Sequence, residues 1–221
     1  MAKQESGTRE KILAQATEVF LERGYRSATI RMIAGRAKVN SALINYYFGD
    51  KKNLYLQVIR FWAQDAFREF PLDFLDDPGA PPEEKVRSFI HHTLMCLFGP
   101  EGRGTGFGRL MEYEAGIAPS DAVHEIVSET IGRPTRALSG AIAQITGVRD
   151  AESLRIYTAC VVGQTVCFYL SRSLYQALLG GLTPGSREEI DALSSRAGDF
   201  ALASLRGLRE KRETEEKERG T

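Results

Sequence analysis

Apolar residues recur at helical spacing along most of the chain. Between residues 9 and 23 they fall three and four positions apart, on one face that holds Ile12, Leu13, Ala16, Val19 and Phe20. Comparable periodicity appears in the segments 29–37, 41–47, 51–70, 83–98, 110–118, 120–145, 152–179 and 186–208. No stretch alternates apolar and polar residues as a half-buried strand does. The pattern predicts an all-α fold of about nine helices.

Proline and glycine divide this pattern into parts. Four prolines and one glycine lie between Pro71 and Pro82, which marks a break in the chain. A glycine-rich stretch over 99–108 follows a helix and lacks the Lys-Ser/Thr of a phosphate loop, so we interpret it as a connection. We expect the following parts: a mobile arm over 1–7, an N-terminal domain over 8–68, a C-terminal domain over 69–208, and a charged, frayed or disordered tail over 209–221.

Two short helices fit between residues 29 and 47. Thr29 and Asn40 have side chains suited to cap them, with Lys38-Val39 as the turn. The second helix, 41–47, is too short to be stable alone, since isolated helices below ~12 residues are marginal. It must pack on its neighbours, and its exposed start carries polar and aromatic residues. These features are typical of a helix that reads the major groove of DNA.

Four sequence motifs around this region occur in order at defined spacing. They are Thr8-Arg-Glu-Lys-Ile-Leu-x-Ala, Phe20-x-x-x-Gly24-Tyr25, Thr29-Ile-Arg-x-Ile-Ala and Ile44-x-Tyr46-Tyr47-Phe48-x-x-Lys51-x-x-Leu54. Together they resemble the TetR/AcrR family of bacterial transcription regulators over residues 8 to 62. The resemblance implies an N-terminal three-helix helix-turn-helix domain and a C-terminal helical domain for ligand binding and dimerisation. It also implies a repressor that binds a palindromic operator as a homodimer and is released by a small-molecule effector.

Carried over position by position, the resemblance assigns phosphate contacts to Thr29, Tyr47 and Lys51. Lys38 stands where the family usually has glycine, and we expect it to add a further phosphate contact. The start of the second short helix and its groove-facing positions complete the DNA-binding set: Asn40, Ser41, Ala42, Leu43, Asn45 and Tyr46. An interior position is the alternative for Leu43.

The resemblance also implies dimerisation through the last two helices, 152–179 and 186–208, and an effector site in the C-terminal domain. Aromatic, methionine and polar side chains there are suited to line a cavity, although ordinary core packing is the alternative for the apolar ones. The candidates are His92, Met95, Phe98, Phe107, Arg109, Glu112, Tyr113, Gln164, Phe168 and Arg172. His91 and His92 are adjacent and point about 100° apart on a helix. We therefore expect neither a metal site nor a cofactor.

The net charge of zero hides an asymmetry. Residues 1–60 hold 11 Lys and Arg against 5 Asp and Glu, net +6, which leaves 18 against 24, net −6, for the rest. A basic N-terminal part suits a protein that meets a polyanion with one end. The sequence has no apolar run of about 20 residues and no signal-peptide core, so we expect a cytoplasmic protein.

The three cysteines, Cys96, Cys160 and Cys167, show no metal-ligand spacing. We expect reduced, buried thiols, with a redox sensor as the alternative. No arrangement of His, Ser, Asp or Cys suggests a catalytic site, which argues against an enzyme. The alternative function is a DNA-binding regulator without a small-molecule ligand, either thiol-responsive or constitutive.

Overall fold

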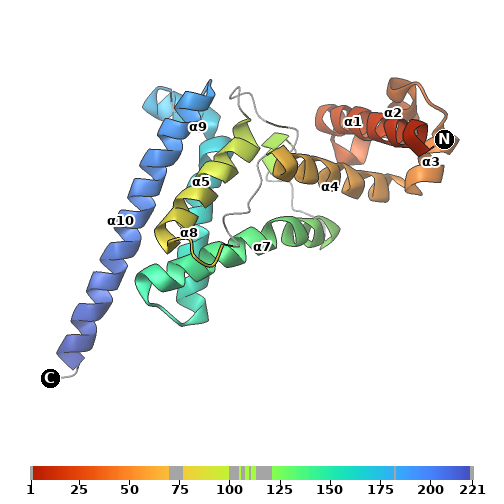
Figure 1. The fold of residues 1–221 in the computed structure, drawn as a ribbon. Helices are drawn as coiled ribbons and strands as arrows, with labels where there is room; N and C mark the ends of the chain where they lie inside the picture. The colour runs from red at the N-terminus through yellow and green to blue at the C-terminus, as the bar shows by residue number, and fades with distance from the viewer. Residues whose placement is uncertain are drawn as a thin grey trace. The chain divides into compact units, whose positions relative to one another are not determined.

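A computed structural model describes residues 2–69, 77–99, 105, 108–109, 111–112, 121–181 and 183–219. Within these residues the chain forms helices and no strand, which confirms the all-α prediction (Figure 1). The helices are α1 (Ala2–Ser27), α2 (Ile30–Ala37), α3 (Ser41–Phe48), α4 (Lys51–Glu69), α5 (Pro82–Phe98), α7 (Asp121–Thr146), α8 (Ala151–Leu170), α9 (Arg172–Leu179) and α10 (Arg187–Arg219). None of the described helices is long and apolar enough to cross a membrane.

The chain divides into two compact units. The first, called the head below, comprises Met1–Ala66 and Arg109–Thr130; the second, the body, comprises Phe67–Gly108 and Ile131–Thr221. The first boundary lies near the expected one at residue 68. The segment 109–130 differs from expectation, because it groups with the head although it was assigned to the C-terminal domain.

The core of the head is built on α1. Its five periodic apolar residues are all buried, as the spacing predicted: Ile12, Leu13, Ala16, Val19 and Phe20. The helix is interrupted at Gly24, whose φ of 76° and ψ of 157° are not helical. The helix begins at Ala2 and so includes residues 2–7 of the expected mobile arm. Ala, Lys, Gln and Glu in this segment favour a helix, which explains the earlier start.

Polar and aromatic contacts join α1 to α4. The indole Nε1 of Trp62 donates to Thr17 Oγ1 over 2.6 Å, and the Thr17 hydroxyl donates to the Leu13 carbonyl over 2.8 Å. The Phe20 ring meets the Tyr55 ring edge-on, with centroids 4.9 Å apart. Thr17 is fully buried, so these bonds satisfy a hydroxyl that burial would otherwise leave unpaired. They hold α4 against α1 in the head.

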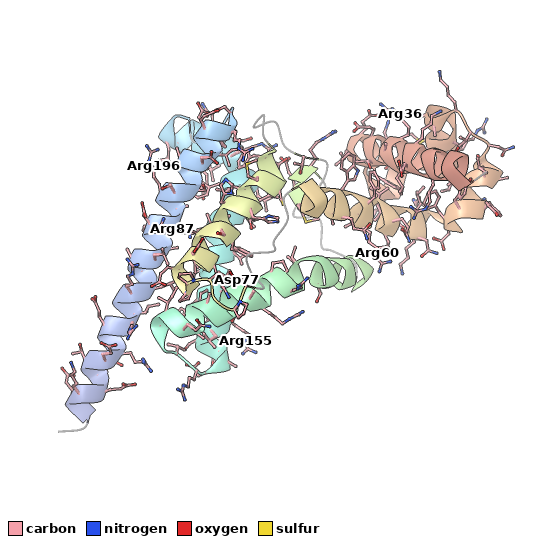
Figure 2. The ribbon with its side chains drawn as sticks, in the orientation of Figure 1. Arg36, Arg60, Asp77, Arg87, Arg155 and Arg196 are labelled. Atoms are coloured by element: carbon pink, nitrogen blue, oxygen red, sulfur yellow. The ribbon has the colours of Figure 1, made fainter. Side chains whose placement is uncertain are left out.

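In the body, α5 packs against both α8 and α10 (Figure 1). Its inner face is apolar, and its outer face forms ion pairs with α10. Arg87 of α5 (Figure 2) donates to Asp199 over 2.6 Å, and His91 Nε2 lies 2.8 Å from Asp191 Oδ1. These pairs are exposed, so the apolar contacts supply most of the stability of this packing.

Two predictions about the last helices were wrong. The expected helix 152–179 is divided at Ser171, whose φ of −102° and ψ of 18° end α8 before α9 begins. The segment 209–219 is helical rather than disordered, because α10 continues to Arg219. Its alternating charges form ion pairs one helical turn apart, which support an exposed helix. They are Arg209–Glu213, Lys211–Glu215 and Arg212–Glu216.

Candidate nucleic-acid interface and effector site

The first of the two short helices, α2, begins at a side-chain cap. Thr29 has an extended backbone, and its Oγ1 accepts a hydrogen bond from the Met32 amide over 3.2 Å. Ile33, Ala34 and Ala37 are buried on its inner face. The cap leaves Thr29 exposed at the positive end of the helix dipole, where an anion is favoured.

Lys38 forms the turn between α2 and α3. Its φ of 55° and ψ of 47° are left-handed. Within the described part of the chain, every other residue with positive φ is a glycine. The Lys38 amide donates to the carbonyls of Ala34 and Gly35 and so ends α2. A side chain in this conformation costs roughly 1–2 kcal/mol relative to glycine, which is the physical reason why glycine is common at such a turn. The Lys38 side chain itself is exposed.

The second short helix, α3, presents one face to solvent. Asn40 caps it, as predicted, since its Oδ1 accepts from the Ala42 amide over 2.9 Å. Ile44 and Phe48 are 0% and 5% exposed, and they anchor α3 to the core of the head. The remaining predicted positions divide into exposed residues, which are Asn40, Ala42, Asn45 and Tyr46, and half-buried ones, which are Ser41, Leu43 and Tyr47.

Tyr46 is the most exposed aromatic residue of α3. Its side chain is 79% exposed, and its ring packs edge-on against Tyr47 with centroids 5.4 Å apart. A large aromatic side chain held out of the core in this way is available to a partner surface. With Ala42 and Asn45 it forms a continuous exposed face opposite the buried residues of α3.

Lys51 lies in the first turn of α4. Its ammonium donates to the backbone carbonyls of Tyr25, Arg26 and Ala28, over 2.9, 3.2 and 3.1 Å. It also lies 4.6 Å from the centroid of the Tyr25 ring. Asp50 caps α4, because its Oδ1 accepts from the Asn53 amide over 2.7 Å.

Arg36 of α2, labelled in Figure 2, is paired with Glu22 of α1. Its guanidinium donates to Glu22 Oε2 over 2.6 Å. This hydrogen bond raises the pKa of Arg36 and lowers the pKa of Glu22. Both side chains are exposed, so the pair orients Arg36 more than it stabilises the fold.

The effector candidates on α5 lie in the core of the body. Phe98 is 1% exposed and meets the Tyr169 ring edge-on at 5.0 Å, and Met95 is 1% exposed. His92 is buried, and burial, with a smaller contribution from the neighbouring His91, lowers the pKa of His92 to about 4. Cys96 Sγ lies 3.1 Å from His92 Nε2. A neutral imidazole and a thiol therefore form a buried polar pair within an apolar region.

Three candidates come from α8 and α9. Gln164 and Phe168 are half-buried, and the Nε2 of Gln164 is a buried donor without a partner in the described structure. Arg172 donates to the Tyr169 carbonyl over 2.9 Å, and its guanidinium lies 4.5 Å from the centroid of the Tyr169 ring. Since α8 packs on α5, these residues and those of α5 belong to one region of the body.

Two of the remaining effector candidates, Arg109 and Glu112, do not join this region. Arg109 belongs to the head, where its guanidinium pairs with Glu18. Glu112 is exposed, and Phe107 and Tyr113 lie outside the described residues. The prediction for the cysteines was also partly wrong, because Cys160 and Cys167 are exposed while Cys96 is buried. Among the described side chains, no group of three or more His, Cys, Asp and Glu is arranged to hold a metal ion.

Sequence reasoning missed a group of contacts at the end of α5. The Thr105 hydroxyl donates to the Cys96 carbonyl, the Thr105 amide donates to the Leu97 carbonyl over 3.0 Å, and the Gly108 amide donates to Thr105 Oγ1 over 2.9 Å. A Cβ on Gly108 would lie only 2.3 Å from the Leu97 carbonyl oxygen. The sequence signal for these contacts is the glycine-rich stretch 99–108, which we interpreted from the sequence only as a connection.

Two family models match the chain. Residues 12–58 match the bacterial regulatory proteins of the tetR family. Residues 82–208, more than half of the chain, match the C-terminal domain of the HTH-type transcriptional dual regulator CecR. The first match contains α2, α3 and the start of α4, and the second contains α5 through most of α10.

Individual proteins agree with these matches. The chain is 34% identical to the HTH-type transcriptional repressor NicS of Pseudomonas putida KT2440 over 92 residues, 40% of this chain and 41% of that protein. It is 25% identical to the HTH-type transcriptional dual regulator CecR of Shigella flexneri over 209 residues, 90% of this chain and 92% of that protein.

A solved structure shows the same fold. It is the transcriptional regulator FadR from Bacillus subtilis in complex with stearoyl-CoA, which superimposes with a TM-score of 0.64 at 16% identity. The superposition covers 87% of this chain and 97% of FadR. The chain therefore belongs to the TetR family of bacterial transcription regulators, with a C-terminal domain of the CecR type.

Proposed function

We propose that this protein binds a palindromic operator as a homodimer, with one α3 in each major groove, and represses transcription until a small-molecule effector releases it. The observation that carries the proposal is the exposed face of α3, formed by Ala42, Asn45 and Tyr46 and held outward by the buried Ile44 and Phe48. A short helix anchored in this way on two others has the geometry of a major-groove reader.

Each residue of this face suits a different contact. The Asn45 amide can pair with adenine through two hydrogen bonds, and the Ser41 hydroxyl can donate to or accept from several bases. Ala42 and Leu43 supply apolar contacts for thymine methyl groups. Tyr46 is largely exposed and supplies both an aromatic ring and a hydroxyl.

The phosphate contacts follow from the ends of the two helices. The Thr29 hydroxyl accepts a bond from the backbone but retains its own hydrogen to donate to a phosphate. Asn40 likewise retains its amide hydrogens at the start of α3. Lys38 precedes α3 and adds a cation, and Tyr47 lies in the last turn of α3 and adds a hydroxyl. Such contacts set the position of the head on DNA without reading its sequence.

Selection of bound fragments from random duplex DNA tests this proposal. The expected product is a palindrome bound with a steep salt dependence. Asn45→Ala should relax base preference at one position in each half-site, at a cost of about 1–3 kcal/mol for the preferred base. Asn53→Ala, an exposed asparagine outside α3, is the matched control. Unchanged preference in the Asn45 variant would show that α3 does not read the bases.

We place the dimer interface on α8 and α10. On α8, Ile156, Cys160, Gly163 and Cys167 form one helical stripe, and Ile156 is 52% exposed. On α10, Phe200 is 70% exposed, and an added Cβ at Gly207 would meet nothing within 4 Å. Large apolar side chains beside small residues, exposed in the single chain, suit close packing of helices from a second subunit.

The proposed effector site lies in the body, around the apolar face of α5 and the Gln164 amide. The effector would be an apolar molecule with an oxygen that accepts a hydrogen bond from Gln164 Nε2, since that donor is otherwise buried and unpaired. The complex of FadR with stearoyl-CoA makes acyl thioesters the first class to test.

Thermal shift with acyl-CoA esters of graded chain length measures this binding. A ligand that binds only the folded protein raises its melting temperature, and the same ligand should weaken the protein–operator complex. Free coenzyme A is the control for the nucleotide part. If no ester acts while an oxidant releases the operator, the thiol-responsive alternative holds instead.

A further inference from the structure

Lys51 has no hydrogen left to donate. A lysine ammonium carries three donor hydrogens, and three backbone carbonyls accept them, those of Tyr25, Arg26 and Ala28. All three distances lie between 2.9 and 3.2 Å, which is the range of full N–H···O hydrogen bonds. A DNA phosphate could reach this ammonium only if one of these bonds broke.

Two of the three carbonyls, those of Tyr25 and Arg26, belong to the end of α1, and that of Ala28 lies just beyond it. The last carbonyls of a helix lack partners within it and carry the negative end of its dipole. Here the interruption at Gly24 turns the chain, and Ala28 immediately precedes the Thr29 cap of α2. A cation at this point supplies hydrogen bonds to carbonyls at the end of α1. It also holds Ala28, the residue that leads into α2.

The place of Lys51 in its own helix supports the same interpretation. A positive charge in the first turn of α4 is unfavourable for the dipole of that helix. The side chain extends away from α4 and packs on the Tyr25 ring, whose centroid lies 4.6 Å from Nζ. The Tyr25 ring in turn lies 4.9 Å from that of Tyr55. The lysine is therefore seated in a packed environment that matches its length and charge.

We propose that Lys51 is a positioning residue, which fixes the connection between α1 and α2 and so sets the orientation of α2 and α3, rather than a ligand of DNA phosphate. This inference rests on the proposed reading of DNA by α3. It concerns how the head is held in its binding geometry. It replaces the phosphate contact that the family resemblance implied for this residue.

The salt dependence of DNA binding separates the two roles. The full-length wild type, Lys51→Met and the control Lys52→Met would be titrated with the duplex selected by the wild type and with an unrelated duplex. Loss of a phosphate ligand makes the slope of log K against log salt shallower by about 0.9. Loss of a positioning residue should instead weaken binding to both duplexes about tenfold or more, with an unchanged slope.

Amide hydrogen exchange over residues 25–33 supplies a readout that does not depend on DNA. Exchange should become faster there in Lys51→Met and stay unchanged in Lys52→Met, an exposed neighbour. Lys51→Arg keeps the charge but cannot direct three donors at three converging carbonyls, so it should show the same faster exchange. This variant carries the test if Lys51→Met does not fold.

Two results would overturn the inference. One is a slope reduced by about 0.9 with exchange unchanged, which would make Lys51 a phosphate ligand; the other is unaltered binding and exchange in both variants. Failure of the wild type to bind any duplex would instead remove the proposed function. The exchange measurement would still decide the structural role of Lys51.

Discussion

The guanidinium of Arg109 donates two hydrogen bonds to the carboxylate of Glu18, each 3.2 Å long, one to Oε1 and one to Oε2. This two-point contact joins α1 to the first residue of the second segment of the head. The preceding residue, Gly108, is bonded through its amide to Thr105 in the body. Two consecutive residues thus have separate partners, Thr105 for Gly108 and Glu18 for Arg109.

Replacing the partners of this pair should cost little stability. Arg109 and Glu18 are 44% and 37% exposed, and exposed pairs contribute about 0.2–1 kcal/mol. We expect a double-mutant cycle with Glu18→Gln and Arg109→Gln, measured by urea unfolding, to give a coupling energy in this range. A coupling above about 2 kcal/mol would show that the pair is part of a larger buried network.

Lys38→Gly should make the protein more stable and its DNA binding weaker. Removal of the left-handed side chain relieves roughly 1 kcal/mol, while loss of a phosphate contact reduces the salt slope by about 0.9. Lys38→Asn is the matched control, because asparagine tolerates this conformation but has no charge. Unfolding and salt titrations of both variants check the two effects separately. Identical slopes in all three proteins would exclude Lys38 as a phosphate contact.

Phe200→Glu should convert the proposed dimer to monomer. A charge in the centre of an apolar interface is left desolvated and unpaired, whereas the same charge in a monomer is solvated. Sedimentation equilibrium measures the mass, and Met32→Glu, an exposed apolar site in the head, is the control. If the Phe200 variant sediments like the wild type, α10 is not the interface.

The alkylation rates of the thiols on α8 test the same interface. In the wild-type dimer, Cys160 and Cys167 should react slowly with an alkylating reagent, because the partner subunit covers them. In the Phe200→Glu monomer they should react rapidly, since both are exposed in the single chain. Cys96 is buried in the body and should react slowly in both proteins until they unfold. Mass spectrometry of labelled peptides distinguishes the three sites, and fast labelling of α8 in the wild type would contradict this interface.

Acid should destabilise the body through His92. Its pKa in the folded protein is about 4, below the ordinary value of 6.5, so the unfolded chain binds more protons between these limits. Stability is therefore lost as the pH falls from 7 toward 4, by about 2 kcal/mol at pH 5. Thermal unfolding of His92→Gln should show a smaller loss over this range. Parallel pH profiles for the two proteins would show that His92 does not titrate as its burial predicts.

The sequence predicted α2 and α3 well because the determinants of these helices are local. Thr29 and Asn40 cap helices through bonds to amides two or three residues away. Ile44 and Phe48 are one helical turn apart and share a face, so their common burial follows from spacing alone. These relations need no knowledge of the rest of the fold.

The body was harder to predict because apolar character does not distinguish core from interface. The sequence predicts buried thiols at Cys160 and Cys167, yet both are exposed in the single chain. In the tail, Arg209 and Glu213 read as part of a disordered charged run, but their spacing of four residues lets them pair on a helix. The composition of this segment suggested disorder, whereas the four-residue spacing of its opposite charges indicates a helix.

The amino-acid sequence by itself determined that the chain is helical, which face of α3 is buried, and that the basic charge lies at the amino end. Only the tertiary structure decided that Lys51 is engaged with carbonyls 23 to 26 residues earlier in the chain and that Arg109 pairs with Glu18, 91 residues away. The physical reason is range. Caps and helical faces depend on neighbours within one or two turns, whereas the partner of a long charged side chain depends on which distant group the fold brings within hydrogen-bonding distance.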